Sequence, residues 1–556
     1  MRDYLLKIPI FFVNFYHFLF PFLCIRTEKR LYLSCSFYHS ARRALDSSAR
    51  NSSTYIIWLA IFPQKCIMRT KISNPDIIIY SITGCPAASV KSIKGELQMY
   101  QIKYDQPVHI HFIGIGGISM SGLAAVLLRR GFTVSGSDAR QSELTRWLTN
   151  FGATIHYPQT AANITDDIDV VVYTAAIHPD NPEFAAVKAK NIPMLTRAEL
   201  LGELMTNYEM PIAVSGTHGK TTTTSMLSHI LMHADMDPTI SVGGILPSIG
   251  GNVRIGHSEN FITEACEYTN SFLSLYPKIA IILNIDADHL DFFKDLDDIR
   301  HSFHLFAKRL PEDGTLILNA EIPSLSDITK DLNCRVITFG VGSGDYQAAN
   351  VTYDSIGCGS FDLLRDGKLI GRFSLAVPGE HNVANAVSAL AAGDLLGIAA
   401  DVMAEGLLSF HGTDRRFQKK GEIGGVTIID DYAHHPTEIK ATLQAARKIL
   451  AKNLWCVFQP HTYTRTKALL DEFVEALSHA DKIVLADIYA ARETDTLGIS
   501  SDDIRKKLEA MGKEAYYFPT FDEIENFLLE HCIPGDLLIT MGAGDVVKIG
   551  ENLLGM

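Results

Sequence analysis

From residue 107 onward, short apolar runs alternate with glycine-rich or acidic segments and with predicted helices. Residues 108–113 are predicted to form a strand, and residues 132–137 a second strand that ends at Asp138. Between them, the glycine-rich residues 114–122 lead into an apolar helix that ends at Leu128. Similar runs predict strands further along the chain, at residues 211–214, 278–284 and 426–429. This alternation predicts an α/β protein in which helices connect parallel strands.

The run at residues 211–214 leads into the segment with the clearest chemistry. It consists of Gly216, Thr217, His218, Gly219, Lys220, Thr221 and Thr222, and a predicted helix follows. Strand, glycine loop and helix N-terminus form a phosphate cradle, in which Lys220 reaches the outer phosphates and the Thr221 hydroxyl binds Mg²⁺. The general P-loop has a further glycine where this chain has Val214, so the loop is a shortened variant. A chance Gly/Lys/Thr turn is the alternative, but the flanking strand and helix favour ATP binding.

The first glycine-rich unit has the strand, loop, helix, strand and acid order of a Rossmann-type nucleotide site. Its candidate binding residues are Gly114, Gly116, Gly117, Ser119 and Asp138. The pyrophosphate would lie on the helix N-terminus, with the acid near the ribose or base. Ser119 replaces the third glycine of the dinucleotide fingerprint. From these residues alone, a nicotinamide cofactor and another nucleotide diphosphate remain equally good interpretations.

Composition narrows the class of protein. The chain has 556 residues, enough for three or four domains, with 47% hydrophobic and 20% charged residues, as in ordinary globular proteins. Its formal net charge of −13 excludes a broad nucleic-acid-binding surface. The nine cysteines are scattered and include no C-x-x-C pair, so neither a zinc site nor a disulfide framework is indicated. Reduced thiols fit a cytoplasmic protein.

The first 98 residues differ from the rest. Residues 8–25 are apolar and aromatic but contain two prolines, and they are one candidate for a short membrane anchor or signal-like segment. The residues that follow show no sustained periodicity. Lys94-Gly95-Glu96 can be encoded by a purine-rich ribosome-binding sequence just before Met99. We therefore expect translation to begin at Met99, with residues 1–98 disordered or a mis-called start; native peptides from before Met99 would contradict this.

The ordered motifs resemble those of the Mur ligases. His111–Gly117 followed by Gly216–Thr222 carries the resemblance, which extends from residue 107 to the end. Further matching segments lie at 173–177, 181–183, 284–291, 379–385, 430–438 and 458–467. The likeness is greatest to the branch that attaches L-alanine to UDP-N-acetylmuramate in peptidoglycan synthesis. It implies that the first glycine-rich unit holds the UDP of the sugar substrate and not a nicotinamide cofactor.

The resemblance also implies three domains. Residues 99–208 would form a Rossmann-like UDP-sugar-binding domain, 209–414 a central P-loop ATPase domain, and 415–556 a Rossmann-like α/β domain that binds the amino acid. A helix at 199–205 would end at the first hinge, and the segment 411–414 would supply the second. For residues 99–556 we expect no membrane contact, a cytoplasmic location, and a monomer or dimer.

Acidic residues at strand ends are the candidate metal ligands of the central domain. Glu264 ends a predicted strand and is the first choice for Mg²⁺, while Glu267 is either an alternative ligand or solvated. An isolated histidine is usually structural, but His289 resembles the family's ligand for a second Mg²⁺. Cys266 stands where the family often has Asp, so no role is assigned to it.

Polar residues near the second hinge are candidates for contact with ATP. Asn382 and Asn385 lie one turn apart on a predicted alanine-rich helix, and His381 precedes them. They are either helix caps or, as the resemblance implies, ligands of ATP. The family's arginine that matches Arg416 meets the γ-phosphate, whereas Arg415 is a second arginine that could be a surface charge.

The last domain supplies the candidate amine site. The resemblance places Tyr432, His434 and Arg465 near the amino-acid substrate, and His434 is a candidate base. Many family members have a second arginine where this chain has Thr462, which leaves selectivity among alanine, glycine and serine open. The predicted catalytic residues are therefore Lys220, His289, Arg416 and His434.

The predicted reaction is transfer of the γ-phosphoryl group of ATP to the lactyl carboxylate, followed by attack of the L-alanine amine on the acyl phosphate. A ligase that recycles a murein tripeptide shares nearly all of these motifs and is the main alternative. A nucleotide-binding protein without activity would lack Lys220, Glu264 or His289. A nicotinamide-dependent oxidoreductase would leave the P-loop unexplained.

Overall fold

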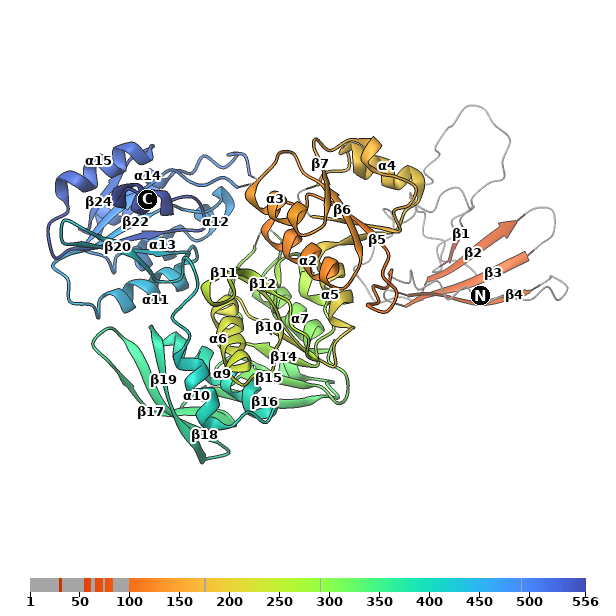
Figure 1. Ribbon diagram of the computed structural model, residues 1–556, viewed down its shortest axis with the longest axis horizontal. Helices are drawn as coiled ribbons and strands as arrows, with labels where there is room; N and C mark the ends of the chain where they lie inside the picture. The colour runs from red at the N-terminus through yellow and green to blue at the C-terminus, as the bar shows by residue number, and fades with distance from the viewer. Residues whose placement is uncertain are drawn as a thin grey trace, which may run out of the picture. The chain divides into compact units, whose positions relative to one another are not determined.

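A computed structural model describes most of the chain. It describes residues 100–556 apart from 175, 176, 291 and 492, and the backbone of four strands before residue 100. The chain divides into two compact units, residues 1–99 and 100–556 (Figure 1). The strands of the first unit form a sheet in the order β1-β2-β3-β4. Their bounds are β1 Arg30–Tyr32, β2 Tyr55–Ile61, β3 Cys66–Ser73 and β4 Asp76–Thr83.

Residues 1–98 are interpreted either as carrying a membrane anchor or as a mis-called start, and most of these residues are not described by the structure. Residues 8–25, the candidate anchor, lie outside the described part of the chain. Among the described residues, no helix is both long and apolar enough to cross a membrane. The start at Met99 stays a prediction.

The second unit contains three sheets, and we call the residues around them the N-terminal, middle and C-terminal parts. In the N-terminal part five parallel strands run in the order β7-β6-β5-β8-β9. These strands are β5 His109–Ile113, β6 Thr133–Ser137, β7 Thr154–His156, β8 Val170–Tyr173 and β9 Met194–Thr196. The helices are α2 Ile118–Arg129, α3 Glu143–Asn150, α4 Pro182–Lys190 and α5 Arg197–Met205, with a 3₁₀ turn η2 at Ala161–Asn163.

The middle part is built on a ten-stranded sheet with β10 near its centre. The order is β12-β11-β13-β10-β14-β15-β16-β17-β18-β19. The strands are β10 Met210–Ser215, β11 Thr239–Leu246, β12 Gly251–Arg254, β13 Asn260–Ala265, β14 Ile279–Ile282, β15 Thr315–Asn319, β16 Arg335–Val341, β17 Tyr346–Tyr353, β18 Cys358–Arg365 and β19 Lys368–Pro378. The helices are α6 Lys220–His233, α7 Leu296–Ala307, α8 Leu325–Thr329, α9 His381–Leu395 and α10 Ala400–Leu408, with 3₁₀ turns η3 Pro247–Ile249 and η4 Tyr268–Ser274.

The C-terminal part has a six-stranded sheet in the order β20-β21-β25-β22-β23-β24, and only its edge strand β20 is antiparallel. The strands are β20 Gln418–Ile423, β21 Val426–Asp431, β22 Leu454–Phe458, β23 Lys482–Leu485, β24 Glu514–Tyr517 and β25 Leu537–Met541. The helices are α11 Pro436–Ala446, α12 Tyr463–Ala468, α13 Leu470–Leu477, α14 Ser501–Ala510, α15 Phe521–His531 and α16 Val547–Leu554.

These sheets determine where functional side chains can gather. Parallel strands present their carboxyl ends at one edge, and β10 lies between β13 and β14, so the loops after these three strands are neighbours. Apolar residues of β10, α6 and α9, including Val214, Leu227 and Leu390, form the core behind that edge. The predicted α/β class with three sheet-bearing parts is confirmed. The boundaries at 208 and 414 stay predictions.

Candidate functional site

The glycine loop that follows β10 forms the N-terminus of α6. Gly219 has φ +85° and precedes Lys220, the first helical residue. The first N–H groups of an α-helix have no partner within the helix, so they point out of its N-terminus. The segment predicted as a phosphate cradle therefore has the required local geometry.

Lys220 is held inside this loop. Its Nζ donates to the carbonyl oxygens of Gly216 (2.5 Å) and Thr217 (3.0 Å), and to Glu267 Oε2 (3.0 Å). Burial alone would lower the pKa of Lys220, but the Glu267 carboxylate outweighs it and raises this pKa. Glu267 is 2% exposed, so the interpretation of Glu267 as a solvated residue is wrong.

Two predicted metal ligands, Thr221 and Glu264, lie next to the backbone of β11 at Gly244 and Gly243. The Glu264 carboxylate accepts from the Gly243 N–H at 2.5 Å, and the Thr221 methyl lies 3.3 Å from the position of a Cβ on Gly244. Thr221 of α6 and Glu264 of β13 thus lie beside adjacent glycines of β11, and a hydroxyl and a carboxylate are oxygen donors of the kind Mg²⁺ prefers, so these residues fit the ion. His289 Nε2 instead lies 3.7 Å from both Glu267 and Asp288.

A cavity of about 350 Å³ adjoins the glycine loop. Of the predicted ATP-binding residues it is lined by His218, Gly219, Thr222, His381, Asn382, Asn385 and Arg416. Apolar side chains that sequence reasoning did not single out complete its wall, namely Val377, Phe410, Phe417, Ala441 and Ala445. Flat apolar walls with a few convergent polar groups suit a purine base.

The two asparagines of α9 are fixed by hydrogen bonds. Asn382 Nδ2 donates to the Pro378 carbonyl (2.7 Å), and Asn385 Nδ2 donates to Asn382 Oδ1 (3.0 Å). Asn385 Oδ1 faces Gly219, at 2.7 Å from where a Cβ would stand. Asn385 therefore packs against the phosphate loop. His381 is the first residue of α9 and lines the same cavity.

Arg415 and Arg416 differ in role. Arg416 lines the cavity, with Nη1 3.9 Å from Glu438 Oε1. Arg415 is not a surface charge: its Nε donates to the buried Asp430 (3.0 Å), and its Nη atoms donate to the carbonyls of Gly544 and Gly542. Arg415 thus fastens the second hinge to the C-terminal sheet. The local sequence gave no indication of this, because its partners are far along the chain.

A second cavity of about 330 Å³ contains the predicted amine-site residues Thr462 and Arg465 together with His289. Arg465 Nη2 donates to Asp288 Oδ1 at 2.8 Å, and Nη1 lies 3.2 Å from His461 Nδ1. Burial opposes the charge of Asp288, but Arg465 holds the pKa of this carboxyl below its ordinary value. The arginine therefore bridges the middle and C-terminal parts beside His289.

Tyr432 and His434 stand at the end of β21. The Tyr432 ring lies near both hinge arginines, 4.9 Å from Arg415 and 5.3 Å from Arg416. His434 Nδ1 donates to the Tyr432 carbonyl (3.0 Å), so its Nε2 is the unprotonated nitrogen. Burial lowers the pKa of His434 to about 4, so the imidazole is neutral at physiological pH. Its ring contacts that of His461, which lines the second cavity.

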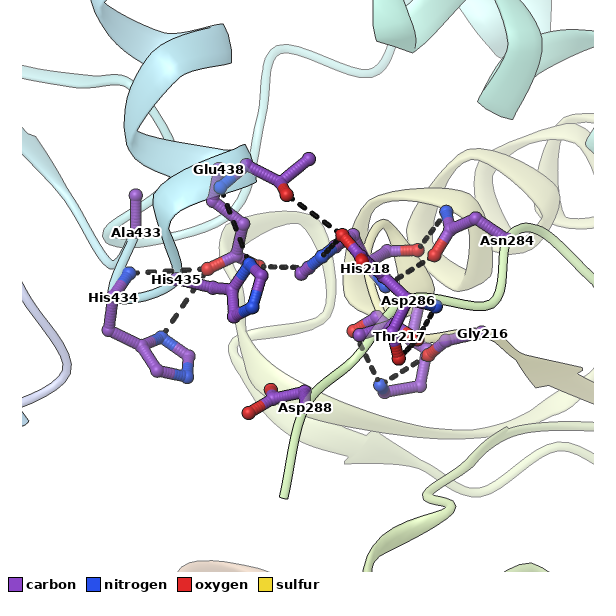
Figure 2. Close-up of polar contacts among 12 residues, drawn as sticks. Gly216, Thr217, His218, Asn284, Asp286, Asp288, Ala433, His434, His435 and Glu438 are labelled. Atoms are coloured by element: carbon purple, nitrogen blue, oxygen red, sulfur yellow. Dashed lines mark hydrogen bonds and ion pairs between the residues drawn. The ribbon is translucent and has the colours of Figure 1, made fainter. Parts of the chain in front are cut away.

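His218, Asp286 and His435 also come close together, from three different loops (Figure 2). Their ligand atoms lie within 4.8 Å of one another, as in a metal site. However, His435 Nδ1 accepts from the Thr437 N–H (3.3 Å), so its proton is on Nε2, which faces the Ala287 carbonyl (3.2 Å). This nitrogen has no lone pair for a metal, and the cluster is better described as a charged contact.

The predicted UDP site is organised around β6. The N–H groups of Gly114 and Ile115 donate to the Ser137 carbonyl, and the Gly116 N–H donates to Asp138 Oδ2 at 2.8 Å. Gly117 caps α2, and Ser119 follows in its first turn. The loop and the acid are thus joined as the pattern predicts.

Arg197 is a site residue that sequence reasoning missed. It begins α5, and its Nη1 donates to Ser119 Oγ at 3.3 Å. Burial lowers the pKa of this guanidinium, and Cys266 and Glu264 oppose that effect. A half-buried cation beside the glycine loop and near Glu264 suits an anionic substrate group. No local motif marks it, because Ser119 and Glu264 lie in other parts of the fold.

Comparison with known proteins covers all three parts of this unit. Family models match residues 109–209 (Mur ligase family, catalytic domain), 214–393 (Mur ligase middle domain) and 415–544 (Mur ligase, glutamate ligase domain). A UDP-N-acetylmuramate–L-alanine ligase of Lachnospira eligens is 59% identical over 82% of this chain and 100% of its own. One of Clostridium botulinum is 52% identical over 81% and 98%.

Solved structures agree with this likeness. UDP-N-acetylmuramate–alanine ligase from Thermotoga maritima has a TM-score of 0.68 at 30% identity, over 80% of this chain and 98% of that one. A murein peptide ligase from Psychrobacter arcticus has a TM-score of 0.61 at 27% identity, over 81% and 98%.

Proposed function

The chain belongs to the Mur ligase family, and we propose that it joins L-alanine to the lactyl carboxylate of UDP-N-acetylmuramate with cleavage of ATP to ADP and phosphate. The observation that carries this is the 59% identity with an alanine-adding ligase across that relative's whole length. The murein peptide ligase is less similar, at 27% identity. The product is an early precursor of peptidoglycan, and we place the reaction in the cytoplasm, where ATP is available.

The first step is phosphoryl transfer. A lactyl carboxylate oxygen attacks the γ-phosphorus of ATP, the bond to the bridging oxygen breaks, and ADP leaves with that electron pair. Lys220 lies at the N-terminus of α6, and Arg416 lines the same cavity, so both would neutralise charge on the transferring group. Thr221 and Glu264 would hold one Mg²⁺ and His289 is the candidate ligand of a second, and these ions would supply Lewis-acid stabilisation of the phosphates.

The second step forms the amide. The neutral amine of L-alanine attacks the acyl phosphate carbonyl, and inorganic phosphate leaves as the C–N bond forms. Arg465 would orient the amino-acid carboxylate in the second cavity, and the unprotonated Nε2 of His434 would accept the proton that the nitrogen loses. Arg197 would meet the diphosphate or lactyl carboxylate of the sugar nucleotide.

Phosphate release by the full chain tests this proposal. With ATP, Mg²⁺ and UDP-N-acetylmuramate present, we expect release that depends on L-alanine, and Lys220→Met should abolish it. Lys506→Met, which removes a cation on the exposed helix α14, is the matched control and should keep full activity. Glycine and L-serine measure the selectivity that Thr462 leaves open. Release with a tripeptide but not with L-alanine would instead identify the recycling ligase.

A further inference from the structure

Glu438 joins three segments that the proposed reaction uses. It is the third residue of α11, and its side chain is mostly buried. Its Oε1 lies 3.2 Å from His218 Nδ1 and 3.9 Å from Arg416 Nη1. Its Oε2 accepts from the His434 N–H at 3.2 Å and lies 3.5 Å from His434 Nδ1. Figure 2 shows this carboxylate between His434 and His218.

The partners of Glu438 come from different places in the fold. His218 belongs to the phosphate loop of the middle part, Arg416 follows the predicted second hinge, and His434 lies in the loop after β21. We propose that Glu438 is a positioning residue whose carboxylate holds the phosphate loop, the hinge arginine and the amine-side histidine in one arrangement. This inference rests on the proposed function, because that function gives Arg416 and His434 their roles.

The contact continues beyond His218. His218 Nε2 lies 3.4 Å from Asp286 Oδ2, in the loop after β14, so the imidazole stands between two carboxylates. Thr437 Oγ1 donates to the same Asp286 oxygen at 2.8 Å. The first turn of α11 is therefore tied to both loops that flank the nucleotide cavity. Although burial disfavours the imidazolium, Asp286 and Glu438 raise the pKa of His218 to about 9, which keeps this bridge charged.

A helix-capping role does not account for this geometry. An acid in the first turn of a helix stabilises it through the helix dipole, and Glu438 also accepts from the His434 N–H just before the helix. Neither effect requires a phosphate-loop histidine or a hinge arginine on the other oxygen. The same geometry also explains His218 itself. Its backbone N–H donates to Asn284 Oδ1 (2.8 Å), and its ring faces carboxylates, so His218 serves to connect the parts rather than to hold phosphate.

Glu438→Gln separates these roles, because the amide oxygen can still accept from the His434 N–H while the charge that holds His218 and Arg416 is lost. We expect kcat/KM for ATP to fall about a hundredfold, the scale at which misplaced catalytic groups cost activity. The KM for UDP-N-acetylmuramate should not change.

The matched control is Lys448→Met. It removes the exposed ion pair between Lys448 and Glu380 (2.7 Å), which also joins the middle and C-terminal parts, but it touches none of the three partners of Glu438. The kinetics of this control should equal those of the wild type.

A double-mutant cycle excludes a merely structural effect. His218→Gln alone should also lower kcat/KM for ATP, and the double variant should lose less than the sum of the two single losses in free energy, because both single variants remove the same His218–Glu438 contact. A loss of folded protein would lower kcat without changing the KM for ATP. If Glu438→Gln does not fold, His218→Gln decides by itself. Wild-type kinetics in Glu438→Gln, or in His218→Gln if Glu438→Gln does not fold, would overturn the inference. An inactive wild-type enzyme would instead overturn the proposed function.

Discussion

Gly219 is a residue at which the nucleotide site tolerates little change. Its φ of +85° disfavours any side chain, and a Cβ would stand 2.7 Å from Asn385 Oδ1. Asn385 cannot easily move, because its amide donates to Asn382. Gly219→Ala should therefore displace the phosphate loop and lower kcat/KM for ATP about a hundredfold, as measured by phosphate release.

Gly250→Ala is the control for Gly219→Ala. Gly250 has φ +66°, but nothing lies within 4 Å of its Cβ position. Both variants introduce backbone strain of about 1–2 kcal/mol, visible as a lower melting temperature. Only the Gly219 variant should lose affinity for ATP. Equal kinetics in the two variants would mean that the contact with Asn385 has no role in the site.

At the same scale, the sequence predicts residues whose role is local and misses those whose partners are distant. The phosphate loop is contiguous, so Lys220 and Thr221 can be identified from the residues around them. Glu267 is separated from Lys220 by 47 positions, and they meet because β10 and β13 are neighbouring parallel strands. Arg415 looks like a surface charge for the same reason, since Gly542 and Gly544 are more than a hundred residues away.

Among the elements, helix α4 is the one that supports the UDP loop most directly. Its first-turn residue Glu183 is fully buried and accepts from Ser137 Oγ and from Asn163 Nδ2 (2.6 Å). The Ser137 carbonyl in turn accepts from Gly114 and Ile115 of the glycine loop. Glu183→Gln leaves one buried donor without an acceptor, which should cost about 1–3 kcal/mol of stability and raise the KM for UDP-N-acetylmuramate.

Glu143→Gln is a matched control for Glu183→Gln. Glu143 also occupies the first turn of a helix, α3, but is exposed. Both variants lose the same interaction with a helix dipole, which is worth less than about 1 kcal/mol. Thermal unfolding and substrate kinetics of the two variants therefore isolate the buried contacts. A change of equal size in both would show that α4 does not support the loop.

Element types follow from the sequence more closely than element ends do. The segment at residues 108–113 predicts β5, observed at His109–Ile113, and its buried His111 is accommodated by a hydrogen bond with Ser135 Oγ. Strand β21 continues through Asp430 and Asp431, whereas the apolar run at residues 426–429 predicts a strand that ends before these two acidic residues. Their carboxylates remain in the strand because each is satisfied by tertiary contacts: Asp430 by Arg415, and Asp431 by the N–H groups of Phe417 and Ala433.

For the whole molecule, the three-part α/β architecture could be predicted, but the contact between the middle and C-terminal parts could not. That contact pairs Arg465 with Asp288 and Thr437 with Asp286, each across more than a hundred residues. No periodicity or local motif encodes such pairs, because they depend on how two separately folded sheets meet. The resemblance indicates which residues belong to the site but not which carboxylates hold them.

The charged bridge at His218 predicts how the whole enzyme responds to alkali. Its pKa is raised from 6.5 to about 9, so the stabilisation it gives to the contact between the parts is complete below pH 6.5 and is lost as the pH rises through 9. Asp286 lies in the same part as His218, so only the share of this shift that Glu438 causes acts between the two parts. Asp286 and Glu438 have lowered pKa values and stay ionised throughout, so they do not cause the change.

The KM for ATP should therefore rise between about pH 8 and about pH 9.5 as His218 loses its proton. His218→Gln should have a higher KM for ATP that is flat over this range, because glutamine does not titrate. An identical pH dependence in this variant would assign the change to another group, such as Lys220, and would mean that the bridge is not what holds the parts together.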